Sequence, residues 1–151
     1  MTVNETVRQQ VRERANRLCE YCHSPEKICT TRFTIDHILP RSLNGSDHLN
    51  NLAFACRRCN ERRYNFVAGY DRITETIVPL FNPRQQQWSD HFIWSADGKE
   101  ILGTTPIGRA TCDRLDLNDT RYPEEESIRS ARELWKRVGL HPPKTDPSQS
   151  A

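Results

Sequence analysis

The spacing of apolar residues predicts a helix over residues 4–18. Apolar side chains recur there at steps of three or four residues, at Val3, Val7, Val11, Ala15 and Leu18. This period places them on one face of a helix. The arginines between them fall mostly on the other faces, so we expect those arginines to be solvated, with some free to meet phosphates.

Two short strands and a second helix are predicted next. Residues 31–38 alternate between β-favouring and polar positions, and Pro40 ends this strand. Residues 51–55 form a second apolar segment, and residues 57–68 have a helical pattern that Gly69 closes. Residues 43–47 between the strands have turn composition. The predicted order is therefore strand, loop, strand and helix.

The pattern is weaker beyond residue 70 but still predicts a hairpin and two helices. Residues 92–94 and 100–102 flank the turn sequence Ala96-Asp97-Gly98-Lys99. Pro106 and Pro123 each open a helical pattern, which runs to residues 117 and 138. We expect an α+β fold: a core of residues 1–70, a hairpin and helix extension of residues 71–140 packed on it, and a disordered tail of residues 141–151, which is rich in Pro and Ser.

Composition limits how this fold can be stabilised. Only 35% of the 151 residues are hydrophobic and 28% are charged, so a modest core needs a staple. No apolar run reaches the ~18 residues of a membrane helix, and the N-terminus has no apolar signal segment, so we expect a cytoplasmic protein without a membrane partner. Residues 1–72 carry a net charge of +4 and residues 73–151 a net charge of −2. The basic first half favours a polyanionic partner.

Two Cys-x-x-Cys pairs are the candidate staple. Four of the six cysteines form them: Cys19, Cys22, Cys56 and Cys59. Disulfides are disfavoured in a reducing compartment, and two such pairs in a small chain are typical of a tetrahedral Zn²⁺ site. The alternative is a pair of redox or unpaired dithiols, although the βαβ pattern of a redox protein is absent.

The other thiols and one histidine are less informative. Cys29 and Cys112 have no paired spacing and are expected to be ordinary small side chains. His23 follows Cys22 and could compete as a ligand, but a solvent-facing histidine is the simpler interpretation.

The residues between the two pairs resemble the HNH nucleases. The resemblance covers about residues 15–66 and is specific because its positions occur in order: Ile35-Asp36-His37-Ile38-Leu39-Pro40, Gly45, Asn51-Leu52, Cys56-Arg57-Arg58-Cys59-Asn60 and Arg63. It implies a ββα-metal core of the His-Me finger type, framed by zinc knuckles. Asn60 stands where the family name implies a histidine, so the motif has the H-N-N form.

Chemistry and resemblance together assign candidate roles. Hydrolysis of a phosphodiester needs a general base, and His37 suits it because its ordinary pKa is ~6.5. The resemblance implies that Asp36 and Asn60 hold the catalytic cation, that Asn51 orients His37 and that Arg63 contacts the scissile phosphate. Hard oxygen ligands favour Mg²⁺ or Mn²⁺.

The expected function is that of a metal-dependent DNA endonuclease, with RNA as an open alternative substrate. The alternative function is a catalytically inactive, zinc-stabilised module that binds nucleic acid. A zinc base deaminase is disfavoured because its His-x-Glu and Pro-Cys-x-x-Cys pairing is absent.

Overall fold

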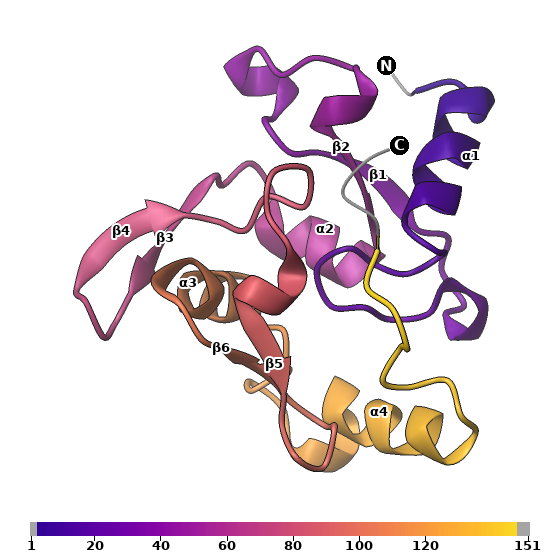
Figure 1. Ribbon diagram of the computed structural model, residues 1–151, viewed down its shortest axis with the longest axis vertical. Coiled ribbons are helices and arrows are strands. Elements are labelled where there is room, and N and C mark those ends of the chain that lie inside the picture. The colour runs from indigo at the N-terminus through magenta and orange to yellow at the C-terminus, as the bar shows by residue number, and fades with distance from the viewer. Residues whose placement is uncertain (1–2, 148–151) are drawn as a thin grey trace. The chain divides into compact units, whose positions relative to one another are not determined.

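The computed structural model describes residues 3–147 and shows helices mixed with two-stranded antiparallel sheets (Figure 1). The chain divides into two compact units. Among the described residues, unit 1 consists of residues 3–67, Asn82–Gln87 and residues 146–147. Unit 2 consists of Ala68–Phe81 and Trp88–Thr145. The α+β class is confirmed, whereas the packing of residues 71–140 on the core stays a prediction.

Unit 1 is built around a ββα arrangement. Strands β1 (Thr34–His37) and β2 (Leu52–Ala55) pair antiparallel, with Asp36 opposite Ala53. Helix α2 (Arg57–Arg63) follows β2 after a single residue and contacts β1, while helix α1 (Glu5–Arg14) contacts β2 (Figure 1). The elements follow the order that the sequence predicts, but α2 ends at Arg63 and not at residue 68, and Gly69 lies in a strand instead of closing the helix.

Helix α1 begins at a cap and ends earlier than predicted. The side chain of Asn4 accepts a hydrogen bond from the Val7 amide at 2.9 Å, which satisfies a free N–H of the first turn. The helix ends at Arg14 instead of residue 18, because Asn16 and Arg17 have φ values of 54° and 57° that turn the chain toward the first cysteine pair.

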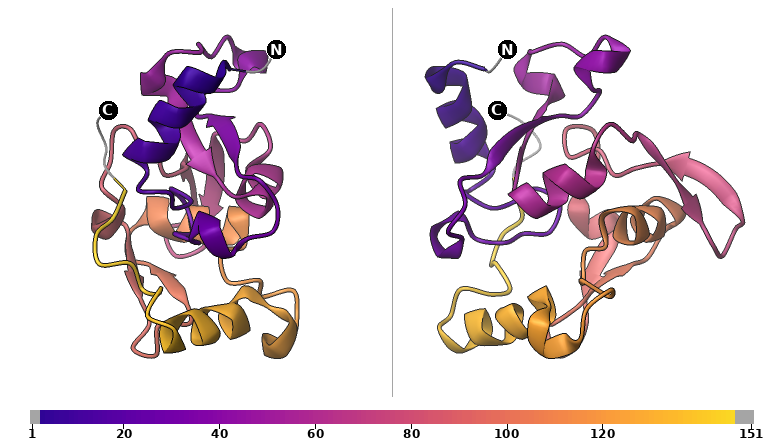
Figure 2. Two further views of the ribbon diagram at one scale, coloured as in Figure 1. Left: turned by 90° about the vertical axis from the view of Figure 1, so that its right-hand side faces the viewer. Right: turned by 180° about the vertical axis from the view of Figure 1, so that it is seen from behind.

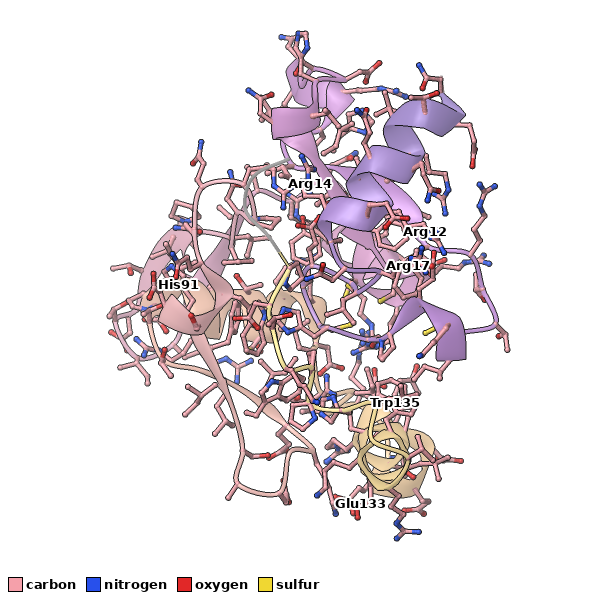
Figure 3. All side chains as sticks on the ribbon, turned by 45° about the vertical axis from the view of Figure 1, so that its right-hand side comes forward. Arg12, Arg14, Arg17, His91, Glu133 and Trp135 are labelled. Carbon is pink, nitrogen blue, oxygen red and sulfur yellow. The ribbon has the colours of Figure 1, made fainter. Side chains whose placement is uncertain are left out.

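The arginines at the end of α1 do not share one environment (Figure 3). Arg14 is buried, and its guanidinium donates to the carbonyl oxygens of Leu49 at 3.0 Å and Leu52 at 2.6 Å. Burial lowers the pKa of Arg14 to about 10. Arg17 is exposed, as predicted. The prediction of a solvated arginine is thus wrong for Arg14, which holds the chain at the start of β2.

Unit 2 consists of two hairpins and two helices. Its strands are β3 (Ala68–Asp71), β4 (Thr76–Pro79), β5 (Phe92–Trp94) and β6 (Ile101–Gly103), and its helices are α3 (Pro106–Leu115) and α4 (Ile128–Arg137). Both hairpins contact α3 (Figure 2). The predicted hairpin and the helix that opens at Pro106 are confirmed. The last helix begins at Ile128 and not at Pro123, and the β3–β4 hairpin was not predicted. The described helices include none that is long and apolar enough to cross a membrane.

His141 lies in the segment expected to be disordered, yet it is buried. Its Nε2 lies 2.8 Å from the carbonyl oxygen of Gly98, and its ring packs edge-on against Trp94 at 4.4 Å. These contacts order a Pro-rich stretch that composition alone assigns to a tail. Residues 148–151 of the predicted tail lie outside the described residues.

Candidate functional site

The two Cys-x-x-Cys pairs converge on one point. The Sγ atoms of Cys19, Cys22, Cys56 and Cys59 all lie within 4.8 Å of one another, and the four residues are buried. Zinc–sulfur bonds of ~2.3 Å in a tetrahedron place the sulfurs ~3.8 Å apart. The Cys22 and Cys56 sulfurs are 3.7 Å apart. The cluster therefore has the size and ligand chemistry of a structural zinc site.

Backbone amides support the same conclusion. The amide of Cys22 donates to Cys19 Sγ at 3.5 Å, and the amide of Cys59 donates to Cys56 Sγ at 3.4 Å. Burial raises the pKa of the Cys19 thiol, whereas hydrogen bonds from the other cysteines lower that of Cys22. A divalent ion bound at this point would replace the protons of the four buried thiols. Since Cys56 is also the N-cap of α2, this ion would fix where α2 begins.

The remaining candidates for zinc ligation stay outside the cluster. Cys29 and Cys112 are partly exposed and are not members of it. His23 is not a member either, but it is fully buried and not solvent-facing as expected, with Nδ1 3.6 Å from a carboxylate oxygen of Asp146. The four-sulfur set is complete without His23.

A buried ion pair lies beside the first pair of cysteines. The sequence did not indicate it. Glu20 accepts a hydrogen bond from the Phe54 amide at 2.7 Å and forms an ion pair with Arg84. Burial raises the pKa of Glu20, and the charge of Arg84 opposes that shift. The pair attaches the segment Asn82–Gln87 to the rest of unit 1, although no local pattern links positions so far apart in the chain.

A pocket of about 550 Å³ opens beside the ββα arrangement. Three of the residues predicted for the site line it, namely Asp36, His37 and Asn60. Arg41 and Tyr64 also contribute to its wall. The hairpin and α2 thus bring together an imidazole, a carboxylate and an amide from separate parts of the sequence.

Asp36 is buried but keeps one oxygen available. Its Oδ2 accepts hydrogen bonds from the hydroxyl of Tyr21 at 2.7 Å and from Nη1 of Arg63 at 3.0 Å. Burial raises the pKa of Asp36, and Arg63 and Tyr21 act in the opposite direction. Neither Asp36 Oδ1 nor the side-chain amide of Asn60 has a hydrogen-bond partner among the described residues. Two free hard oxygens in one pocket fit a cation such as Mg²⁺ that retains most of its water ligands.

Arg63 has a different position from the one predicted. It is 2% exposed, and it does not line the pocket. Its guanidinium donates to Asp36, to the carbonyl oxygen of His37 at 3.2 Å and to that of Ile38. Every described hydrogen bond of Arg63 ties α2 to the end of β1, so this structure gives no support to a contact with the scissile phosphate, which stays a prediction.

His37 is held by a carboxylate that the sequence marked only as part of a turn. Its Nε2 lies 2.7 Å from Oδ1 of Asp47, which also accepts from Nε of Arg41 at 3.1 Å. The bonds from His37 and Arg41 lower the pKa of Asp47. An ionised carboxylate only accepts, so Nε2 carries a proton, and in the neutral imidazole the lone pair of His37 is therefore on Nδ1. Nδ1 has no partner among the described residues.

Asn51 supports the loop and does not contact the His37 ring. Its side chain accepts from the Leu39 amide at 2.8 Å and donates to the carbonyl oxygens of Leu39 at 3.0 Å and Ser46 at 2.8 Å. The direct orienting bond predicted for Asn51 is thus absent, and Asp47 takes that position. Gly45 permits the same loop closure, because a Cβ there would lie 1.6 Å from the carbonyl oxygen of Leu39.

Comparison with known families agrees with this geometry. Residues 19–66 match the HNH endonuclease family. This HNH region contains both cysteine pairs, the ββα arrangement and every residue predicted for the site, so the resemblance found in the sequence is confirmed for this part of the chain. The chain matched no curated protein and no solved structure.

Proposed function

We propose that the HNH region is the catalytic part of a metal-dependent DNA endonuclease. The observation that carries the proposal is the pocket in which the free Nδ1 of His37 lies with the unpaired oxygens of Asp36 and Asn60. A module that only binds nucleic acid has no need for a histidine held in one tautomer. We further propose that the four cysteines hold a structural Zn²⁺ in a reducing compartment such as the cytoplasm.

His37 would act as the general base. Its Nδ1 takes a proton from water, and the resulting hydroxide attacks the phosphorus of the scissile phosphodiester. The bond to the leaving 3′ oxygen breaks, and that oxygen takes a proton from solvent. Asp47 accepts the hydrogen bond from Nε2–H during the whole reaction and stabilises the imidazolium that forms.

Asp36 and Asn60 would hold one Mg²⁺ or Mn²⁺, which when bound takes up negative charge on the phosphate and the leaving oxygen. Arg63 already neutralises Asp36, so the pocket has little net negative charge of its own. We therefore expect cation binding to depend on the charge that the DNA phosphate adds. Arg41, which lines the pocket, replaces Arg63 in our proposal as the basic side chain nearest to the phosphate.

The first test is a digest of supercoiled plasmid DNA by the purified chain in Mg²⁺, Mn²⁺, Ca²⁺ or EDTA. We expect relaxed circles in Mg²⁺ or Mn²⁺ and none in EDTA, since hard oxygen ligands favour these ions. A gel shift in Ca²⁺ measures binding separately. Salt-sensitive binding without product in any of the metals would contradict the proposal and support the binding module.

An Asp47→Asn substitution tests how His37 is held. We expect kcat to fall about 10- to 100-fold with little change in KM, because the amide no longer requires a proton on Nε2. Nitrogen NMR of histidine-labelled protein should show His37 losing its preference for the Nε2–H tautomer. Asp113→Asn is the matched control, since Asp113 is also paired with an arginine but lies on the exposed surface of unit 2. An unchanged tautomer and an unchanged kcat would rule out this role.

A further inference from the structure

Tyr64 ends helix α2 with an unusual backbone conformation. Its φ is 50° and its ψ is −124°. The left-handed residues Asn44 and Asp116 have ψ values of 28° and 60°, which an L-residue tolerates far better. Glycine fits the Tyr64 conformation without cost, whereas a residue with a Cβ is strained there. The sequence nevertheless places a large aromatic residue at this position.

Burial of the Tyr64 side chain does not compensate for the strain. The residue is 68% exposed, and Phe66 beside it is 44% exposed. The two ring centroids are 6.4 Å apart with an interplanar angle of 58°. Strain of this kind that serves no packing purpose is concentrated at functional sites.

The aromatic pair is fixed relative to the pocket. Tyr64 itself lines the pocket with His37 and Asn60. The Tyr64 amide donates to the carbonyl oxygen of Asn60 at 3.0 Å, and the Phe66 amide donates to that of Arg63 at 3.0 Å. The backbone that carries both rings is therefore fixed at the end of the helix that carries Asn60, and Tyr64 forms part of the pocket wall.

We propose that the ring of Tyr64, with Phe66 tilted beside it, is a stacking platform for an unpaired nucleobase of the strand that enters the pocket. Aromatic side chains stack on any base, and such platforms occur beside basic grooves that track the phosphates. Helix α2 supplies the basic charge through Arg57, Arg58 and Arg62 against Glu61, whereas Arg63 is buried and paired with Asp36. That charge disfavours an apolar protein as the occupant and favours a nucleotide. The proposal deepens the endonuclease function and rests on it for the identity of the strand.

The platform also predicts a substrate class. A base in an intact duplex is already stacked and must be extruded before it can reach Tyr64, which costs free energy. Single-stranded or locally unpaired DNA should therefore bind more tightly than a duplex of the same sequence.

The test measures binding of the full, zinc-loaded chain to a fluorescent single-stranded DNA by anisotropy, in Ca²⁺ and without added Mg²⁺ or Mn²⁺. Tyr64→Ala should weaken binding about 5- to 100-fold, whereas Tyr64→Phe should bind as the unmodified protein does. Tyr70→Ala, which removes a 47% exposed tyrosine of β3, is the control and should have no effect. On an abasic strand, which has the phosphates without the bases, the difference between Tyr64→Ala and the unmodified protein should disappear.

A Tyr64→Gly substitution separates binding from folding. It should raise Tm by about 2–8 °C because it removes the strain, and it should still bind DNA as weakly as Tyr64→Ala. Unchanged affinity of both variants, or an equal loss on the abasic strand, would overturn the platform. Because the readout is binding, a chain that binds through Tyr64 but never nicks plasmid would overturn the endonuclease proposal alone.

Discussion

Replacing His37 by alanine should reduce the rate of DNA cleavage by about 10²- to 10⁴-fold, the range typical for loss of a general base. His37 is the histidine that lines the pocket, and the Asp47 bond leaves its Nδ1 free to accept a proton from water. The side chain is 15% exposed and lies at the end of β1, so its removal should leave the fold intact. DNA binding in Ca²⁺ should change little. The measurement is the initial rate of plasmid nicking in Mg²⁺ or Mn²⁺.

His48→Ala is the matched control for this experiment. His48 is an exposed histidine in the segment that joins β1 to β2, and it does not line the pocket. Its variant should cleave at the unmodified rate. If His37→Ala nicks plasmid as fast as His48→Ala, His37 is not the base and the proposed mechanism is wrong.

Loss of one zinc ligand should unfold unit 1. Binding of structural zinc typically contributes ~10–16 kcal/mol in small zinc domains, which matches or exceeds the ~5–15 kcal/mol by which most proteins are stable. Cys59→Ser removes one fully buried sulfur of the four-cysteine cluster. We expect this variant to lose bound zinc and the cooperative melting of unit 1. Elemental analysis and circular dichroism measure the two effects.

Cys29→Ser tests whether loss of zinc and of cooperative melting follows from the loss of any cysteine or only from the loss of a member of the cluster. Cys29 lies outside the four-sulfur cluster, is half-buried, and donates from its thiol to the carbonyl oxygen of Pro25 at 3.3 Å. We expect this variant to retain about one zinc ion per chain, because the tetrahedral set is intact, and to melt within a few degrees of the unmodified protein. Purified unmodified protein without zinc, or a Cys59→Ser variant with unchanged melting, would contradict the assignment.

The buried guanidinium of Arg63 neutralises the carboxylate of Asp36 within the site, which the motif alone does not imply. Arg63 compensates the charge of Asp36 and also holds the carbonyl oxygens of His37 and Ile38. An uncompensated carboxylate at this depth would be costly. The same bond network therefore stabilises the hairpin against α2 and weakens the attraction of the free pocket for a cation.

Local chemistry determined much of this protein. The two Cys-x-x-Cys pairs specify their own turns through N–H to sulfur bonds, so the four-cysteine cluster that we propose to hold zinc could be expected from their spacing. The short apolar segments and the turn sequence at residues 96–99 predict their strands for the same reason: the signals lie within a few residues of one another. The resemblance to the HNH nucleases was likewise found from the order of residues in the sequence alone.

Only the tertiary structure decided which polar groups meet across the fold. Nothing in a helical pattern distinguishes Arg14 and Arg63, which are buried on carbonyl oxygens, from Arg17, which faces solvent. Asp47 and His37 are ten residues apart and meet because the intervening loop closes on itself. Buried charges and loop-closing contacts depend on what the opposite element presents, and that information is distributed over the whole chain.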